Sequence, residues 1–164
     1  MFTFTRAEDL KREDILVLYG LLLDEKLLQV FFHDCEHMSF SDFLAYARSP
    51  ANWFYMAEKD GVIAGFGVIN NFSSSGRAAF LHTCTYKECR GVNAVAAMQA
   101  FLLFIKSNSE IESLAALLPA PYRAARKLVE ACGFNEVARL PRAMRLYRGS
   151  TGRDVDGCLN ILTF

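Results

Sequence analysis

The segment from Val92 to Lys106 restricts the fold more than any other part of this chain. When it is placed on a helix of 3.6 residues per turn, apolar side chains occupy nearly every side of it. Such a helix must be buried, and a sheet offers the surface that can bury it. We therefore expect a fold in which this helix packs against a sheet.

The residues on both sides of this helix predict the remaining elements. Alternation of apolar and polar residues indicates strands, and recurrence at three to four residues indicates helices. We expect a strand over 2–5, one long helix over about 12–33 or two broken near Asp24, a short helix capped by Ser39 or Ser41, strands over 53–57, 62–69 and 78–86, the helix over 92–106, a strand over 111–118, a helix over 122–132, and strands over 135–147 and 155–162.

This order, β-α-α-β-β-β-α-β-α-β-β, predicts an α/β fold of one domain over residues 1–164. The first half of the sheet should be mostly antiparallel, because a hairpin turn at Asp60-Gly61 joins two of its strands. The strand after the buried helix should pair in parallel with the strand before it through a right-handed crossover. The strands that end near Tyr86 and Leu118 should then splay around a cofactor-sized cleft.

Composition limits the class of protein. The chain has 164 residues, of which 52% are hydrophobic and 22% charged, which excludes disorder. Its longest apolar runs are shorter than the roughly 20 residues that span a membrane, and no secretory signal is visible, so we expect a cytoplasmic protein. Five cysteines without a CxxC pair argue against a disulfide framework or a zinc ribbon.

Charge is balanced overall but unevenly distributed. The net charge is zero, which gives no indication of nucleic-acid binding. Residues 1–60 carry six basic and eleven acidic side chains, whereas residues 121–164 carry eight basic and four acidic ones. The basic side chains near the carboxyl end are either solvated faces of a helix and a strand or the lining of an anion site.

The turn from Thr85 to Asn93 is the candidate anion site. In α/β sheets, ligands bind where a turn at the carboxyl end of a strand leads into a helix, because amides of the first helical turn are unpaired and the helix dipole is positive there. The residues whose amides could hold a pyrophosphate are Arg90, Gly91, Val92, Asn93, Ala94 and Val95.

This turn and a later stretch resemble the GNAT superfamily of N-acetyltransferases. The resemblance covers nearly the whole chain and rests on the element order, on the segment from Thr83 to Gly91, and on Leu118-Pro119…Ala125…Gly133-Phe134. Arg90 matches the first position of the family turn R/Q-x-x-G-x-G/A. The departures are Asn93 and Val95 in the glycine positions, and Tyr122 and Val129 in the Asn and Tyr positions of the later helix.

The resemblance implies an acetyl-coenzyme A-dependent N-acyltransferase that moves an acetyl group to the amine of a small molecule or protein by direct attack. It implies that the turn binds pyrophosphate, and that the backbone of Thr83 and Thr85 aligns the pantetheine arm. Tyr122 and Arg126 on the later helix would contact the cofactor. His82 or Glu88 would act as the base, since a histidine of ordinary pKa suits neutral pH.

A second interpretation comes from a closer echo among GNAT-like proteins of tailed bacteriophages. It covers the helix at Phe43, the strand at His82, the stretch from Leu118-Pro119 to Phe134, and Arg139-Leu140-Pro141. Several such proteins are thought to be virion or accessory components. The chain could then be catalytically silent, bind a protein partner, and reside in the host cytoplasm or the virion. The four departures favour this alternative, because a valine in the tyrosine position has no proton to give.

Other reactive side chains carry less information. His33, Cys35, Glu36 and His37 are metal-capable, and the two histidines could share one helical face, but without a second group of ligands we interpret them as a polar helix end and predict no metal. His82 could equally be a packed strand residue. Cys84 and Cys89 lack the partners of a thiol nucleophile.

Overall fold

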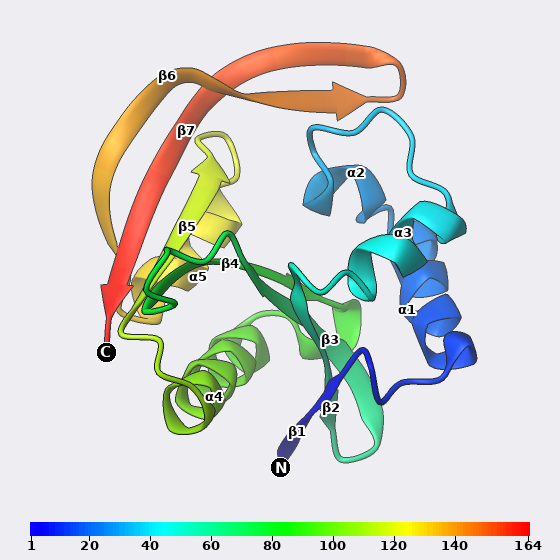
Figure 1. The fold of residues 1–164 in the computed structure, drawn as a ribbon. Helices are drawn as coiled ribbons and strands as arrows, with labels where there is room; N and C mark the ends of the chain where they lie inside the picture. Colours follow the sequence, from blue (N-terminus) through cyan, green and yellow to red (C-terminus); the bar gives the residue numbers. More distant parts are fainter.

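The computed structural model describes all residues from Met1 to Phe164, and its seven strands form one sheet in the order β1-β2-β3-β4-β5-β7-β6 (Figure 1). Every neighbouring pair is antiparallel except β4 and β5, which confirms the predicted mixed sheet with one parallel crossover. The strands are β1 (Phe2–Arg6), β2 (Trp53–Lys59), β3 (Val62–Asn70), β4 (Ala78–Thr85), β5 (Ser113–Pro119), β6 (Asn135–Arg148) and β7 (Thr151–Thr163).

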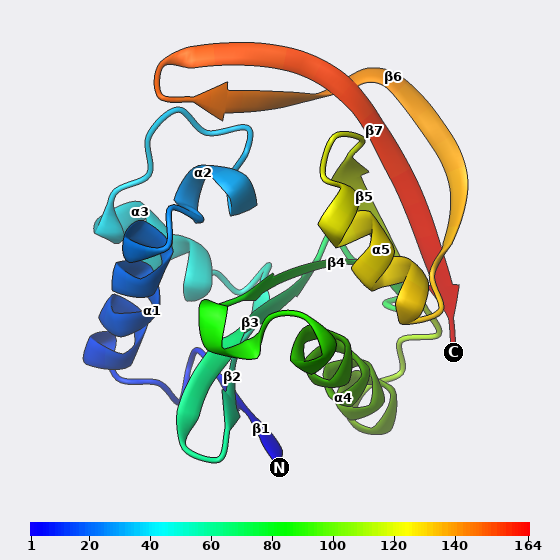
Figure 2. The same cartoon turned by 180° about the vertical axis from the view of Figure 1, so that it is seen from behind.

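Helices cover both faces of this sheet. One face carries α1 (Arg12–Asp24), α2 (Leu28–Phe31) and α3 (Phe40–Ala47), and the other carries α4 (Val92–Asn108) and α5 (Arg123–Ala131), which Figure 2 shows from behind. Successive residues of a strand face opposite sides, so Val68 belongs to the core under α1–α3 and Ile69 to the core under α4. The predicted packing of α4 on the sheet is confirmed, but the helix is not buried all round, because Val92 is 85% and Leu103 65% exposed. No helix is long and apolar enough to cross a membrane.

The long amphipathic segment before α3 is broken, as one of the two alternatives predicted. α1 ends at Asp24, and Lys26 has a φ of 57°, which a right-handed helix cannot contain. The short α2 ends at Phe31, so the predicted helix end at His33 was wrong by two residues. Ser39, rather than Ser41, caps α3, because its Oγ accepts a hydrogen bond of 3.2 Å from the amide of Asp42.

The β6–β7 hairpin is longer than the sequence predicted. β7 begins at Thr151 instead of Val155, and the tip of the hairpin arches over to α2 (Figure 1). There the amide of Gly149 donates to the side chain of Gln29 (3.1 Å), and the Gln29 amide group donates back to the Gly149 carbonyl (3.1 Å). These contacts join the carboxyl-terminal hairpin to the helices at the start of the chain.

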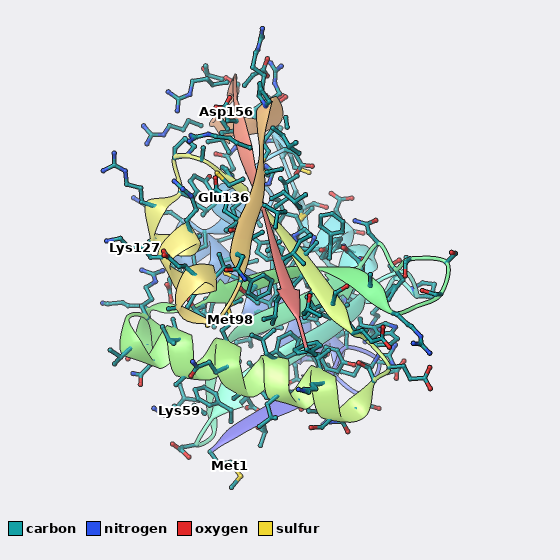
Figure 3. All side chains as sticks on the ribbon, turned by 90° about the vertical axis from the view of Figure 1, so that its left-hand side faces the viewer. Met1, Lys59, Met98, Lys127, Glu136 and Asp156 are labelled. Carbon is teal, nitrogen blue, oxygen red and sulfur yellow. The ribbon has the colours of Figure 1, made fainter.

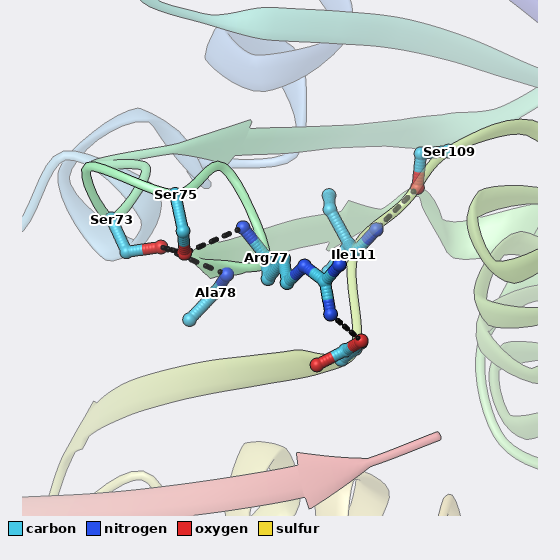
Figure 4. Close-up of polar contacts among 7 residues, drawn as sticks. Ser73, Ser75, Arg77, Ala78, Ser109 and Ile111 are labelled. Carbon is cyan, nitrogen blue, oxygen red and sulfur yellow. Dashed lines mark hydrogen bonds and ion pairs between the residues drawn. The ribbon is translucent and has the colours of Figure 1, made fainter.

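β4 and β5 pair over only three residues each, 78–80 with 113–115. Their closed end is fixed by Arg77, which Figure 4 shows. Its carbonyl accepts from the amides of Glu112 (2.7 Å) and Ser113 (3.1 Å), and its guanidinium pairs with Glu112 (2.6 Å). Beyond Phe80, β4 stays with β3 and β5 stays with β7, so the two strands diverge. The predicted splay is confirmed.

Two glycine substitutions test how the sheet is packed. A Cβ on Gly65 would overlap the backbone carbonyl of Cys84 on the neighbouring strand, whereas a Cβ on Gly20 in α1 meets nothing within 4 Å. We expect Gly65→Ala to lower the free energy of unfolding by about 1–3 kcal/mol. Gly20→Ala should raise it by about 0.5–1 kcal/mol, because alanine favours the helix. Urea denaturation of both variants measures this difference, and equal effects would contradict the described packing.

Candidate functional site

The turn between β4 and α4 begins with the short 3₁₀ helix η1 (Lys87–Cys89) and ends at Gly91, the N-cap of α4. Gly91 has a φ of 68° and a ψ of −132°, a conformation that strongly favours glycine. The amides of Gly91, Val92 and Asn93 precede the first residue that can pair along the helix. They form the unpaired amide group at the positive end of the α4 dipole.

The turn offers fewer free amides than the six predicted from the sequence. The amide of Arg90 donates to the carbonyl of Lys87 (3.3 Å), and that of Ala94 donates to Gly91 (3.0 Å). Val95 lies far enough into α4 for its amide to bond along the helix. The candidate anion site is therefore limited to the amides of residues 91–93.

The side chains that replace glycine in this turn contact other parts of the fold. Oδ1 of Asn93 accepts a hydrogen bond from Nζ of Lys59 on β2 (3.3 Å). Val95 packs against the core under α4. Both substitutions therefore have a structural use that leaves the backbone amides of the turn in place.

The guanidinium of Arg90 in this turn is already paired with a carboxylate from the end of α1. Glu25 follows the last residue of α1, pairs with Arg90, and accepts hydrogen bonds from the amide of Lys87 on both oxygens (2.9 Å each). Its side chain is 16% exposed. Sequence analysis missed this contact, because Glu25 stands in a polar interruption 65 residues before its partner and nothing local marks it.

The backbone of Thr83 and Thr85 faces the gap between β4 and β5. Backbone groups of successive strand residues point to opposite neighbours, and the amide of Tyr86 donates to Ala64 on β3 (2.9 Å). The odd-numbered residues of β4 consequently direct their amides and carbonyls toward β5, as Arg77 does. Because pairing with β5 stops at Phe80, the strand edge at Thr83 and Thr85 has no ladder partner.

The enclosed space beside this edge is small. A cavity of about 30 Å³ lies between β4 and α4 and is lined by residues that include Thr83, Thr85, Met98, Phe101 and Leu128. This volume holds about one water molecule. This cavity lies between the sheet and α4 and includes no residue of β5, so it is not the gap between β4 and β5, and the cofactor-sized cleft stays a prediction.

His82 lies on the opposite face of β4, toward α1–α3. Its Nε2 is 3.2 Å from Oδ1 of Asn70 on β3, and its ring centroid is 6.4 Å from that of Phe31. Burial lowers the pKa of His82 below the ordinary 6.5, the neighbouring His33 lowers it further, and Asp34 opposes both. His82 is therefore neutral at pH 7 and able to accept a proton.

Glu88, the other predicted base, is not close to His82. It is exposed on η1 and makes no hydrogen bond or ion pair. Tyr86, which precedes η1, is four residues beyond His82 along the chain, a separation of about 13 Å in an extended strand. The structure therefore places Glu88 beside the amides of the turn and His82 farther back along β4, so the two cannot serve one reacting atom.

α5 holds the remaining predicted site residues. Tyr122 is its N-cap, and burial raises the pKa of the Tyr122 hydroxyl against the opposing charge of Arg148. Arg126 pairs with Glu136 on β6 (2.9 Å), and Figure 3 shows this face with Lys127 and Glu136 labelled. An open cavity of about 440 Å³ adjoins it, lined by Ala120, Pro121, Arg123, Arg126, Arg139, Val155 and Asp156.

The tyrosine position of the family helix is closed off in this chain. Val129 is 5% exposed and packs in the core between α4, α5 and the sheet. A larger side chain there would overpack that core. Val129 has no hydroxyl, and the surrounding core leaves no room for a tyrosine side chain at this position.

The histidine and cysteine cluster before α3 does not form a metal-binding face. His33 and His37 lie in the loop after α2, so the helical spacing considered from the sequence is absent. His33 instead contacts the hairpin tip, where its carbonyl accepts from the amide of Tyr147 (3.1 Å). No group of three or more His, Cys, Asp or Glu side chains is arranged to hold a metal ion.

Comparison with solved structures identifies the fold. A spermidine N-acetyltransferase from Vibrio cholerae, solved with CoA and spermine, superposes with a TM-score of 0.80 at 16% identity and covers 99% of this chain and 95% of its own. An acetyltransferase from Salmonella typhimurium that modifies the N-terminal serine of ribosomal protein L7/L12 gives 0.81 at 13% identity, with the same coverage. The microcin C7 self-immunity acetyltransferase MccE, solved with acetyl-CoA and AMP, gives 0.73 at 14% identity over 94% of this chain and 89% of its own.

These neighbours are acetyltransferases, and the chain has the fold of the GNAT superfamily that its sequence resembles. No protein-family model matches the chain, and no curated protein matches it in sequence. At these identities the likeness establishes the fold, and the function has to be argued from the site.

The lowered pKa of His82 predicts a pH-dependent stability. Because the folded state favours the neutral ring, this contribution is complete above pH 6.5 and is lost as the pH falls through the folded-state pKa. We expect the free energy of unfolding to decrease on acidification below pH 6.5, and to decrease less steeply in His82→Gln. Urea denaturation between pH 5 and 7.5 measures both slopes. His37→Gln, which removes an exposed histidine, is the matched control and should keep the wild-type slope.

Proposed function

We propose that this protein is an acetyl-CoA-dependent N-acyltransferase that transfers an acetyl group to an amine by direct attack. One observation carries the proposal: the unpaired backbone edge at Thr83 and Thr85 leads into the free amides at residues 91–93. An extended ligand with an anionic end fits this sequence of groups. The fold supports the proposal, because solved neighbours with it hold CoA or acetyl-CoA.

The residues that would hold acetyl-CoA follow from this arrangement. The amides of Gly91, Val92 and Asn93 would bind the pyrophosphate at the positive end of α4, where the left-handed Gly91 lets the backbone approach closely. The backbone of Thr83 and Thr85 would hydrogen-bond the pantetheine arm. Arg90 and Arg126 would contact the cofactor while each stays paired with a carboxylate, Glu25 and Glu136 respectively. Ala94, Val95 and Tyr122 would complete the surroundings. When bound, acetyl-CoA supplies the acetyl group as an activated thioester.

The chain also offers a proton acceptor and a proton donor. Neutral His82 accepts the proton that the attacking amine releases. Tyr122 is our candidate proton donor to the leaving sulfur, in place of the tyrosine that is absent at Val129, because a phenolic hydroxyl is protonated at neutral pH. Burial raises its pKa further. Glu88 is the alternative base, for an amine that reaches the exposed turn. The acceptor is a small-molecule or protein amine.

The competing proposal is a catalytically silent GNAT-fold protein that binds a protein partner, as a phage virion or accessory component would. Two observations favour it: Arg90 is already paired with Glu25, and Val129 has no proton to give. Binding of acetyl-CoA separates the two proposals, because only the enzyme needs it.

We expect acetyl-CoA to bind in calorimetric titration, and Gly91→Ala to weaken its affinity at least about tenfold by distorting the turn. Gly61→Ala is the matched control, because Gly61 also has a positive φ (81°) and open space but lies in the β2–β3 turn. Both variants should lose about 1–3 kcal/mol of stability from backbone strain, and only Gly91→Ala should lose binding. No heat and no thermal stabilisation at millimolar acetyl-CoA would favour the silent alternative.

The ion pair between Glu25 and Arg90 gives a second test. A pyrophosphate at the turn would be repelled by the Glu25 carboxylate, so Glu25→Gln should increase acetyl-CoA affinity by about fivefold, which corresponds to about 1 kcal/mol. Glutamine can still accept the hydrogen bond from Lys87, which preserves the turn. Glu112→Gln removes the partner of Arg77 at the closed end of the strands and should leave the affinity unchanged.

A further inference from the structure

The side chains behind His82 form a chain of hydrogen bonds whose direction is fixed at one end. Nδ2 of Asn52 donates to the backbone carbonyl of Tyr46 (2.8 Å). A carbonyl oxygen can only accept, so the amide of Asn52 cannot be turned the other way. Its Oδ1 consequently faces Asn70 and accepts from Nδ2 of that residue (3.3 Å).

The same reasoning carries the direction on to His82. Asn70 uses its nitrogen toward Asn52, so its Oδ1 faces Nε2 of His82 (3.2 Å), and it also accepts from Nδ2 of Asn71 (3.2 Å). Because Oδ1 only accepts, Nε2 of His82 must carry the proton. A neutral imidazole has one such proton, so Nδ1 carries the lone pair.

We propose that Asn70, oriented by Asn52, is a positioning residue that fixes His82 with its proton on Nε2 and thereby makes Nδ1 the proton acceptor for the amine. The catalytic part of this inference rests on the proposed function. The tautomer itself does not, and it can be measured without any substrate.

Nδ1 of His82 has no hydrogen-bond partner in the protein. It is not fully buried, because the only fully buried side-chain N or O atom without a partner is Nε of Arg126. The charged groups that act on the His82 ring are His33 and Asp34 in the loop after α2, and the ring of Phe31 covers it from α2.

The proton balance favours this arrangement. As the amine nitrogen bonds to the acetyl carbon and the carbon–sulfur bond breaks, Nδ1 takes the amine proton and the sulfur leaves with the bonding electrons. His82 is then positively charged, and its Nε2–H still donates to Oδ1 of Asn70. A hydrogen bond from a charged donor is stronger than one from a neutral donor, so Asn70 stabilises the charged form of His82 as the proton moves.

Long-range ¹H–¹⁵N correlation spectra test the tautomer directly. The chain has three histidines, and the signals that His82→Gln removes identify His82. We expect the Nε2–H tautomer above the pKa of His82, and a mixture of tautomers in Asn70→Ala and, to a smaller extent, in Asn52→Ala. Asn71→Ala is the matched control, because Asn71 also donates to Asn70 but does not orient it, and it should leave the spectrum unchanged. An Nδ1–H tautomer in the wild type, or no change in Asn70→Ala, would overturn the proposal.

Kinetics test the catalytic part. We expect Asn70→Ala to lower kcat with an amine acceptor by on the order of 10- to 100-fold, less than the 10²–10⁴ that a general base is worth, without changing KM for acetyl-CoA. Asn70→Asp keeps an acceptor for Nε2–H but adds a negative charge, so it should restore the tautomer and move the acidic limb of the kcat profile to higher pH.

Two kinetic results would overturn the catalytic part. An acidic limb that stays in place in Asn70→Asp would show that His82 is not the base. A fixed Nε2–H tautomer in a protein that binds acetyl-CoA but acetylates no amine would refute the proposed function, and with it the catalytic part, while leaving the orienting role of Asn70 established.

Discussion

The candidate site depends on the short pairing between β4 and β5. At one end, Arg77 ties the strands together through its carbonyl and its ion pair with Glu112. At the other end, β3 holds β4 as far as Thr85, and β7 holds β5 as far as Pro119. Neither strand can approach the other without breaking a longer ladder. The polar edge at Thr83 is thus left unpaired by the sheet, and such groups must find water or a ligand.

The segment after α1 connects the two ends of the site. Glu25 reaches the turn that opens α4, whereas Gln29 and His33 contact the tip of the β6–β7 hairpin. Close behind His33, the charge on Asp34 acts on His82. One stretch of ten residues therefore contacts the turn that opens α4, acts electrostatically on His82, and holds the long hairpin in place.

The features that could be predicted from the sequence are those that local residue patterns determine. The periodicity of α4 and the order of strands were enough for the mixed sheet, its crossover and the splay, and the turn at Gly91 was recognised from residue type. The start of β7 was missed, because Thr151 and its neighbours are polar and largely exposed, so they show no alternation. The contacts of Arg90 with Glu25 and of His82 with Asn70 join residues 65 and 12 positions apart and depend on packing, so no local pattern reveals them. The same holds for Val129, whose burial only the packed core decides.

The two ends of the site differ in their electrostatics. At Gly91, unpaired amides and the α4 dipole favour an anion. The Glu25 carboxylate already neutralises part of the positive charge of this turn through its ion pair with Arg90. At His82, burial disfavours the charged ring and lowers its pKa, so the neutral form predominates at pH 7. Because His82 lies about 13 Å before Tyr86 along the strand, a compact anion at the turn cannot contact the histidine. A ligand that uses both ends must be extended, charged at one end and uncharged at the other, and it must follow the unpaired edge of β4 between them.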